Sequence, residues 1–469
     1  MAYRSCGSSR RLMYPPDLDV GGIRLAGPER IAPGFRCTGV ASVASVPARR
    51  PATRVVYRHA EPILLLGLAI PSAAIDLRIA QTWSWPAGLI ALWLGATALA
   101  VGAALFRGQL RAIGSALVIG SLYAVPIVGA IIRWHTVPSP TALIGDGAYQ
   151  TQLAGDFLLR GIDPYGADYA AAGLSAAPWG ETFASPALHH LVTWPGQFLW
   201  PLPLQLAARP LGWWDERVFL LLAAGATGWL LLRLFPGLPG RLAATAFFLI
   251  PGHSLVAVLG DNDLPMLALV LAALLAADRR RYLLMGLLLG LAVVTKQHAL
   301  LAVPLVATWA VVRGADFRGM IRAAGVAAIV GVAVVAPFVV WNAGAFVRDT
   351  LVFLAGSGLD AYPINGFGLS ALLLSSGVIL DPRGAFPFAL IELIVGTGVW
   401  FLGWRWIRAR ARLADVLLFA GLAMLLVLYV SRYFHDSHLL LGAELILAGL
   451  AARTRPLAVP PRGRAVLAA

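Results

Sequence analysis

The chain has 469 residues, of which 59% are hydrophobic and only 13% are charged. Soluble domains carry about 25% charged residues, so this composition excludes an ordinary soluble protein. The formal net charge of +14 does not indicate nucleic-acid binding, because basic residues in a membrane protein mainly report its topology. Cys6 and Cys37 imply neither a disulfide framework nor a metal site.

The first 58 residues are rich in Arg, Pro, Gly and Ser and show no hydrophobic periodicity. We expect 1–58 to be a disordered basic tail in the cytoplasm. No signal peptide is expected, since no apolar stretch lies near the N-terminus. A transmembrane domain is expected over 59–452, followed by a cytoplasmic C-terminal tail over 453–469.

Apolar runs of helical length recur along this domain. They are continuous rather than alternating, which predicts helices and not barrel strands. The expected fold is therefore all-α, a polytopic bundle of about 12 transmembrane spans. The spans are placed at 62–80, 86–106, 113–132, 216–235, 242–259, 264–277, 282–295, 299–312, 323–341, 386–407, 413–431 and 438–452. Within 282–295, Gly286 and Gly290 form a small-residue face that would permit close helix packing.

Arginines are concentrated in alternate connections between these spans, as the positive-inside rule requires of cytoplasmic turns. We therefore expect a multi-pass protein of the plasma (inner) membrane with both termini inside. The long connection 133–215 then lies outside, and its aromatic and proline residues suit interfacial helices. Four polar clusters also fall on the outer side and predict one outward-facing polar cavity. They are 145–152, 260–263, 296–298 and 431–438.

Two residues in these clusters could carry chemistry. Asp146 precedes a helix-like run, so it is either an N-cap or a general base, and the spacing leaves both open. Lys296 is the only lysine in the chain. A charge at mid-membrane costs about 2.5–3.5 kcal/mol, which favours a ligand over simple snorkelling of the side chain toward water.

The segment IGDGAYQTQLAGDFLLRGIDPYGADY at 144–169 and the segment from GDND at 260–263 to TKQH at 295–298 carry a resemblance. The chain resembles integral-membrane glycosyltransferases of the type-C fold over about 113–452. More narrowly, it is similar to the bacterial polyprenyl-phosphate-mannose-dependent mannosyltransferases. It departs from that pattern by two extra spans before the Asp146 loop. The loop also lacks a paired acidic motif, which leaves metal dependence open.

The resemblance implies an inverting transfer of mannose, or a similar hexose or pentose, from a polyprenyl-phosphate donor. The acceptor would be a lipid-linked or cell-envelope glycan, and the partners are these substrates and the lipid bilayer, without nucleic acid. Asp146 would deprotonate the acceptor. Donor phosphate or sugar would be bound by Lys296, Gln297, His298, Arg432 and His435. Further sugar contacts would come from Asp163, Tyr165, Asp261, Asp263 and His438. No cofactor is expected, although a divalent metal is possible.

A transporter or lipid flippase remains the alternative, because short helices and intramembrane charges suit it equally well. It would normally show paired repeats in the two halves, and we find none. Neither a Walker A motif nor a dinucleotide fingerprint occurs in the sequence, which disfavours a soluble nucleotide donor.

Overall fold

The computed structural model describes residues 51–137, 144–176, 185–356 and 361–453. Most of the expected N-terminal tail and nearly all of the C-terminal tail lie outside these residues, as do Cys6 and Cys37. The first helix begins at Pro51, inside the range expected to be tail.

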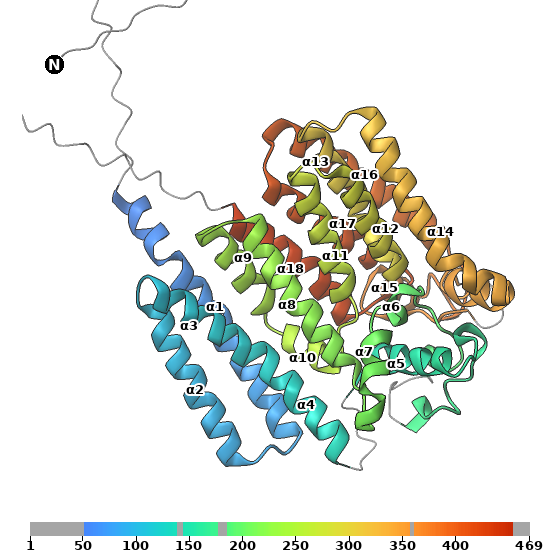
Figure 1. Cartoon of the computed structure of the whole chain (residues 1–469), viewed down its shortest axis with the longest axis horizontal. Coiled ribbons are helices and arrows are strands. Elements are labelled where there is room, and N and C mark those ends of the chain that lie inside the picture. The colour runs from blue at the N-terminus through green and yellow to red at the C-terminus, as the bar shows by residue number, and fades with distance from the viewer. Residues whose placement is uncertain (1–50, 138–143, 177–184, 357–360, 454–469) are drawn as a thin grey trace, which may run out of the picture. The chain divides into compact units, whose positions relative to one another are not determined.

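The described chain is helical almost throughout, which confirms the all-α class. Among the described residues, the only strands are β1 (Asn365–Gly366) and β2 (Tyr433–Phe434), which pair in parallel. They are far apart in sequence, so this short pairing fixes the late segment 361–385 against the connection that follows residue 429. Figure 1 shows the arrangement of the helices along the chain.

Three helical stretches precede the long connection 133–215: α1 (Pro51–Thr82), α2 (Ala87–Leu105) and Gln109–Thr136. The last comprises α3 (Gln109–Ile119), the π-helical turn η1 (Gly120–Ala124) and α4 (Val125–Thr136). They share a small apolar core built around Leu65, Trp93 and Leu122.

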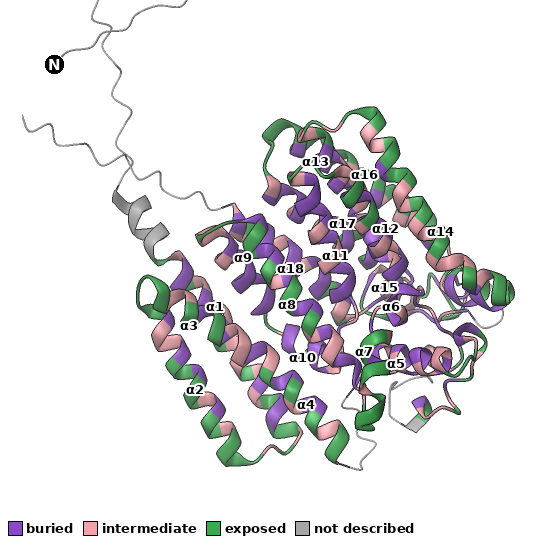
Figure 2. Cartoon of the chain, in the orientation of Figure 1, coloured by how far each residue is buried: buried purple, intermediate pink, exposed green. Residues whose placement is uncertain are grey.

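The main bundle follows, with the longest buried stretches in its central helices (Figure 2). Its helices are α8 (Glu216–Leu234), α9 (Leu238–Phe248), α10 (His253–Leu259), α11 (Leu264–Asp278), α12 (Tyr282–Thr295), α13 (Val303–Val312), α14 (Phe317–Val347), α16 (Phe388–Arg410), α17 (Leu413–Tyr429) and α18 (Asp436–Ala452). Short helices occur between α4 and α8, namely α5 (Asp146–Leu159), α6 (Gly196–Leu199) and α7 (Leu202–Ala208).

Six of the described helices are long and apolar enough to cross a membrane on their own. The number rises to seven if one bent pair of helices is counted as a single span. That pair is α9 and α10, which meet at 64°, so the helix predicted over 242–259 is not continuous. Pro251 and Gly252 break it, and Gly252 has a φ of +95°, which favours glycine. Helices α11, α12, α13 and α17 are apolar but shorter.

The small-residue face predicted on α12 lies against α14. A Cβ added at Gly286 would lie 2.1 Å from the backbone oxygen of Ala323, and one at Gly290 would lie 2.8 Å from that of Ala327. Glycine is therefore required at both positions for the two backbones to approach this closely.

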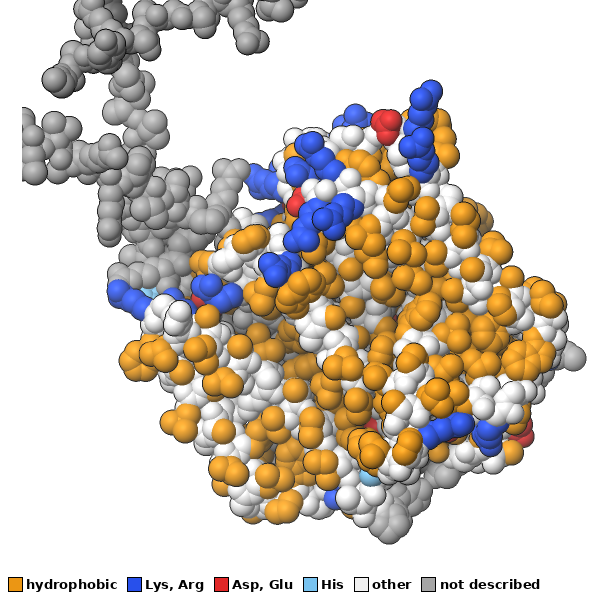
Figure 3. Space-filling model, in the orientation of Figure 1, with side chains coloured by type: hydrophobic (Ala, Val, Ile, Leu, Met, Phe, Trp, Pro, Cys, Tyr) orange, Lys and Arg blue, Asp and Glu red, His pale blue; other side chains and the backbone are white. Residues whose placement is uncertain are grey.

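Helix direction separates two ends of the bundle. The connections 233–241, 278–281, 313–322 and 405–412 hold twelve arginines and lie at one end, here called the arginine-rich end. The face in Figure 3 is mainly hydrophobic, with most of its basic side chains gathered along the upper rim. The four polar clusters lie at the opposite helix ends.

One structured segment was not anticipated by the sequence. Between α14 and α16 the chain forms the π-helical turn η7 (Arg348–Val352), β1 and the short helix α15 (Leu369–Ser375). Because α14 ends opposite the arginine-rich end, this segment reaches the polar clusters.

Candidate functional site

A cavity of about 290 Å³ brings the polar clusters together. It is lined from all four of them and also from the late segment. The lining includes Gly145, Asp146, Gln150, Thr193, Asp261, Asn262, Lys296, Gln297, His298, Tyr362, Tyr433, His435, Asp436 and His438. The clusters are not neighbours in sequence, because long stretches of helix separate them. The tertiary fold therefore brings them together.

Asp146 is the first residue of α5, and Gly145 is the N-cap. Its Oδ1 accepts a hydrogen bond from the backbone N–H of Gly147 at 2.8 Å. Its Oδ2 accepts one from the hydroxyl of Ser185 at 2.6 Å. The half-buried carboxylate therefore lies on the cavity wall in a fixed orientation, with lone pairs left for a substrate.

Lys296 directly follows the last residue of α12, and its backbone is extended. The 3₁₀ turn Gln297–Leu301 begins at the next residue. Lys296 Nζ lies 2.8 Å from Asp263 Oδ1 and donates to Asn262 Oδ1 at 2.7 Å. An ammonium group has three donors, so one remains for a ligand. The GDND turn thus holds the lysine.

The two aspartates of that turn have opposite environments. Burial, reinforced by the Asp263 carboxylate, raises the pKa of Asp261 to about 7. Burial also acts to raise the pKa of Asp263, but Lys296 and His298 outweigh it and hold that pKa below its ordinary value. Asp261 lines the cavity, whereas Asp263 lies behind Lys296 with 2% of its surface exposed.

Three histidines line the cavity beside the lysine. Burial lowers the pKa of His298, although the nearby Asp263 opposes this. Burial likewise lowers the pKa of His435 against the carboxylates of Asp436 and Asp146. His298 and His438 have ring centroids 5.4 Å apart. These imidazoles are neutral at neutral pH, and each can then donate one hydrogen bond.

Arg432 does not line this cavity, which corrects the expectation that it would. It is 2% exposed, and its guanidinium donates to the backbone oxygens of Tyr362, Pro382 and Gly384. It holds the late segment in place because a planar group with five donors can reach three carbonyls at once. A direct contact with donor phosphate is therefore not supported.

Asp163 and Tyr165 also lie outside the cavity lining. Asp163 caps the 3₁₀ turn Pro164–Gly166 by accepting from the backbone N–H of Tyr165. Tyr165 is buried, and its hydroxyl donates to the backbone oxygen of Thr193 at 2.9 Å. Both support the wall that Thr193 forms.

The sequence did not reveal several lining residues. The rings of Tyr362 and Tyr433 have centroids 4.5 Å apart. Asn262 accepts a hydrogen bond from Lys296. Tyr433 lay inside a recognised polar cluster, so it could have been named. Tyr362 lies in a segment without any distinguishing motif.

Over the residues that the structure describes, no group of three or more His, Cys, Asp and Glu side chains is placed to hold a metal ion.

An apolar groove of about 740 Å³ lies beside the polar cavity, between α12, α13 and α14. No charged residue lines it. It approaches the cavity at two points: Trp194 lines the groove next to Thr193, and Val294 lines it two residues before Lys296.

The family model described as Glycosyltransferase family 87 matches residues 195–431. The chain belongs to this family. No curated protein and no solved structure matches the chain.

This member of glycosyltransferase family 87 is thus a multi-pass membrane protein with a polar cavity at one end of its helices. The matched segment contains Asp261, Asp263 and Lys296 but ends before His435 and begins after Asp146. A transporter or flippase is not favoured for a member of a glycosyltransferase family.

Proposed function

We propose that this family 87 glycosyltransferase moves a sugar from a polyprenyl-phosphate donor to a hydroxyl of a lipid-linked or cell-envelope glycan. The observation that carries the proposal is the pairing of one polar cavity with one apolar groove. A donor with a phosphate head and a long hydrocarbon tail needs both environments next to each other.

In the proposed arrangement the donor phosphate lies against Lys296, Gln297 and the histidines. The third N–H of Lys296 and the imidazole N–H groups would donate to phosphate oxygens as negative charge develops there. The tail would lie in the groove, where burial of apolar surface contributes roughly 25 cal/mol per Å². Mannose is the sugar that the sequence resemblance suggests.

Asp146 is the proposed general base. Its carboxylate would take the proton of the acceptor hydroxyl while that oxygen attacks the anomeric carbon and the lipid phosphate leaves from the opposite face. One displacement of this kind inverts the anomeric configuration. The excess of arginine at the other end supports a location of the cavity on the outer face of the plasma membrane.

The test uses protein reconstituted in liposomes with radiolabelled polyprenyl-phosphate mannose and a lipid-linked mannoside acceptor. We expect a product of inverted configuration and, for Asp146→Asn, a loss of turnover of about 10²–10⁴-fold. Retention of configuration would overturn the mechanism. Transfer from a nucleotide sugar but not from the lipid donor would overturn the donor class.

A further inference from the structure

The orientation of Asp146 depends on a serine from a distant part of the outer connection. Ser185 Oγ donates to Asp146 Oδ2 at 2.6 Å and accepts from the backbone N–H of Ala187 at 3.2 Å. The second bond orients the hydroxyl so that its hydrogen is directed at the carboxylate. Ser185 is 7% exposed, so bulk water does not readily replace it.

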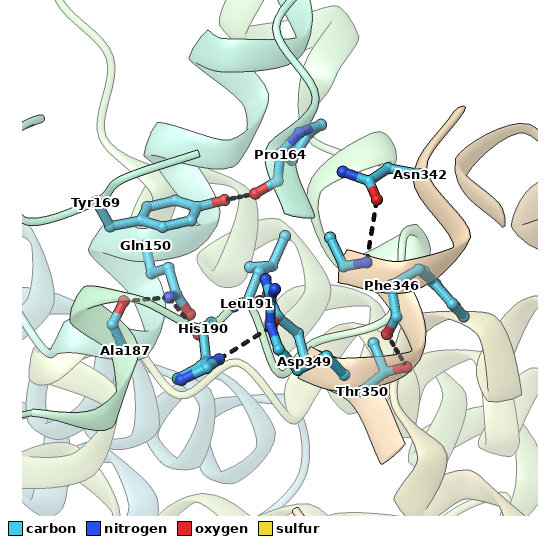
Figure 4. A network of polar contacts seen from close by, with 12 residues as sticks. Gln150, Pro164, Tyr169, Ala187, His190, Leu191, Asn342, Phe346, Asp349 and Thr350 are labelled. Carbon is cyan, nitrogen blue, oxygen red and sulfur yellow. Dashed lines mark hydrogen bonds and ion pairs between the residues drawn. The ribbon is translucent and has the colours of Figure 1, made fainter. Parts of the chain in front are cut away.

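The segment that carries Ser185 is held by Asp349, in η7 at the end of α14. Asp349 Oδ1 lies 2.9 Å from His190 Nδ1, and Oδ2 accepts from the backbone N–H of Leu191 at 3.1 Å (Figure 4). The His190 ring also stacks on Phe353, with centroids 4.0 Å apart. Asp349 is 1% exposed, so this anchor is buried.

The same segment is tied to the helix that carries the base. Gln150 lies one turn after Asp146 on α5, and its Nε2 donates to the backbone oxygens of Ala187 and His190 at 2.5 and 2.9 Å (Figure 4). Gln150 is 1% exposed. Segment 185–191 is therefore fixed against α5 on one side and against η7 on the other.

We propose that Ser185, held in place by the Asp349–His190 pair, is the positioning residue that aims Asp146 at the acceptor hydroxyl. This inference rests on the proposed function and deepens it. The serine occupies one oxygen of the carboxylate and restricts its rotation, so the remaining lone pairs face the cavity.

The experiment compares Ser185→Ala with wild type in the liposome assay with radiolabelled polyprenyl-phosphate mannose. A misplacement of about 1 Å can cost 10²-fold in rate, so we expect kcat to fall about 10- to 100-fold. KM for the donor should stay within about twofold, because Ser185 does not contact the phosphate site. A fall in kcat at nearly constant KM is an effect that a merely structural role would not produce. Ser185→Thr, which keeps the hydroxyl, should recover most of kcat.

Ser175→Ala is the matched control, since Ser175 is an exposed serine of the same outer connection whose hydroxyl donates to the backbone oxygen of Ala170. It should leave kcat and KM unchanged. Ser185→Cys, with its weak S–H donor, carries the test if Ser185→Ala shows no cooperative melting transition. Asp349→Asn should lower kcat in the same direction as Ser185→Ala.

Two failures can be told apart. If Asp146→Asn keeps near-wild-type turnover, the proposed function fails regardless of Ser185. If Asp146→Asn is inactive while Ser185→Ala or Ser185→Cys keeps wild-type kcat, the positioning role is overturned and the proposed function stands.

Discussion

Lys296 and Asp263 form an ion pair at the edge of the cavity, with 2.8 Å between Nζ and Oδ1. The side chains are 14% and 2% exposed, so each charge depends on the other for compensation. The sequence resemblance implies that Lys296 binds the donor phosphate or sugar. The structure adds that it lies against the GDND turn, whose Asp263 carboxylate compensates its charge while one donor remains for a ligand.

The first prediction concerns the stability of this pair. Removing one partner of a buried ion pair costs about 3–5 kcal/mol, because the other charge stays buried and unpaired. Lys296→Met should lower the free energy of unfolding by this amount, and adding Asp263→Asn should recover most of it. Denaturation in detergent micelles measures both effects. Equal losses for the single and the double variant would contradict this account.

A matched control lies at the arginine-rich end. Arg313 Nε is 3.3 Å from Asp278 Oδ1, with side chains 39% and 34% exposed. Exposed pairs of this kind contribute about 0–1 kcal/mol. Asp278→Asn should therefore change the free energy of unfolding far less than Lys296→Met.

The second prediction separates donor binding from proton transfer. The Lys296→Met, Asp263→Asn double variant should bind radiolabelled polyprenyl-phosphate mannose more weakly by about 1.5–3 kcal/mol, the contribution of one charged hydrogen bond. It should also turn over more slowly, since the phosphate gains charge as the bond breaks. Asp146→Asn should leave donor affinity nearly intact, because that residue acts on the acceptor. Equal and mild effects of both variants on donor affinity and turnover would contradict the roles assigned to Lys296 and Asp146.

The third prediction is a pH dependence of stability. The pKa of Asp261 is raised by burial from 3.8 to about 7, so the folded protein binds this proton more tightly than the unfolded chain does. The resulting stabilisation is complete below about pH 3.8 and is lost as pH rises toward about 7. The Tm of wild type should therefore fall relative to that of Asp261→Asn as pH rises through this window. Burial lowers the pKa values of His298 and His435, so their contribution to stability changes with pH in the opposite direction. This contribution is the same in wild type and in Asp261→Asn, so it cancels from the difference in Tm. A difference in Tm that does not change with pH would show that Asp261 is not buried as a neutral acid.

The fourth prediction tests the apolar groove. Ala328 lies on α14, lines the groove and is exposed. Ala328→Phe should fill part of the space and raise KM for a long-chain polyprenyl donor, with less effect on a short-chain analogue. Ala333→Phe is the control, since Ala333 is an exposed alanine of the same helix that does not line the groove. The same change in KM for both donors would show that the groove does not hold the tail.

The sequence by itself determined the class of the molecule and the end of the bundle at which the polar residues gather. Continuous apolar runs can satisfy their backbone in a membrane only as helices, so the helices followed from composition. Because neighbouring helices alternate in direction, Asp146, Lys296 and His435 had to lie at one end and the arginine-rich connections at the other. Clustered polar residues between apolar runs were therefore sufficient to locate much of the cavity lining.

Only the tertiary structure decided what each of these side chains does. Asn262 and Lys296 are 34 residues apart, and Asp146 and Ser185 are 39 apart, so no local pattern announces either contact. Arg432 looked equivalent to Lys296 in sequence, yet its guanidinium is directed at three backbone oxygens of the late segment. A buried charge needs a partner because burying it alone is costly. Which partner it contacts depends on how the helices pack, and the neighbouring residues in the sequence do not determine that packing.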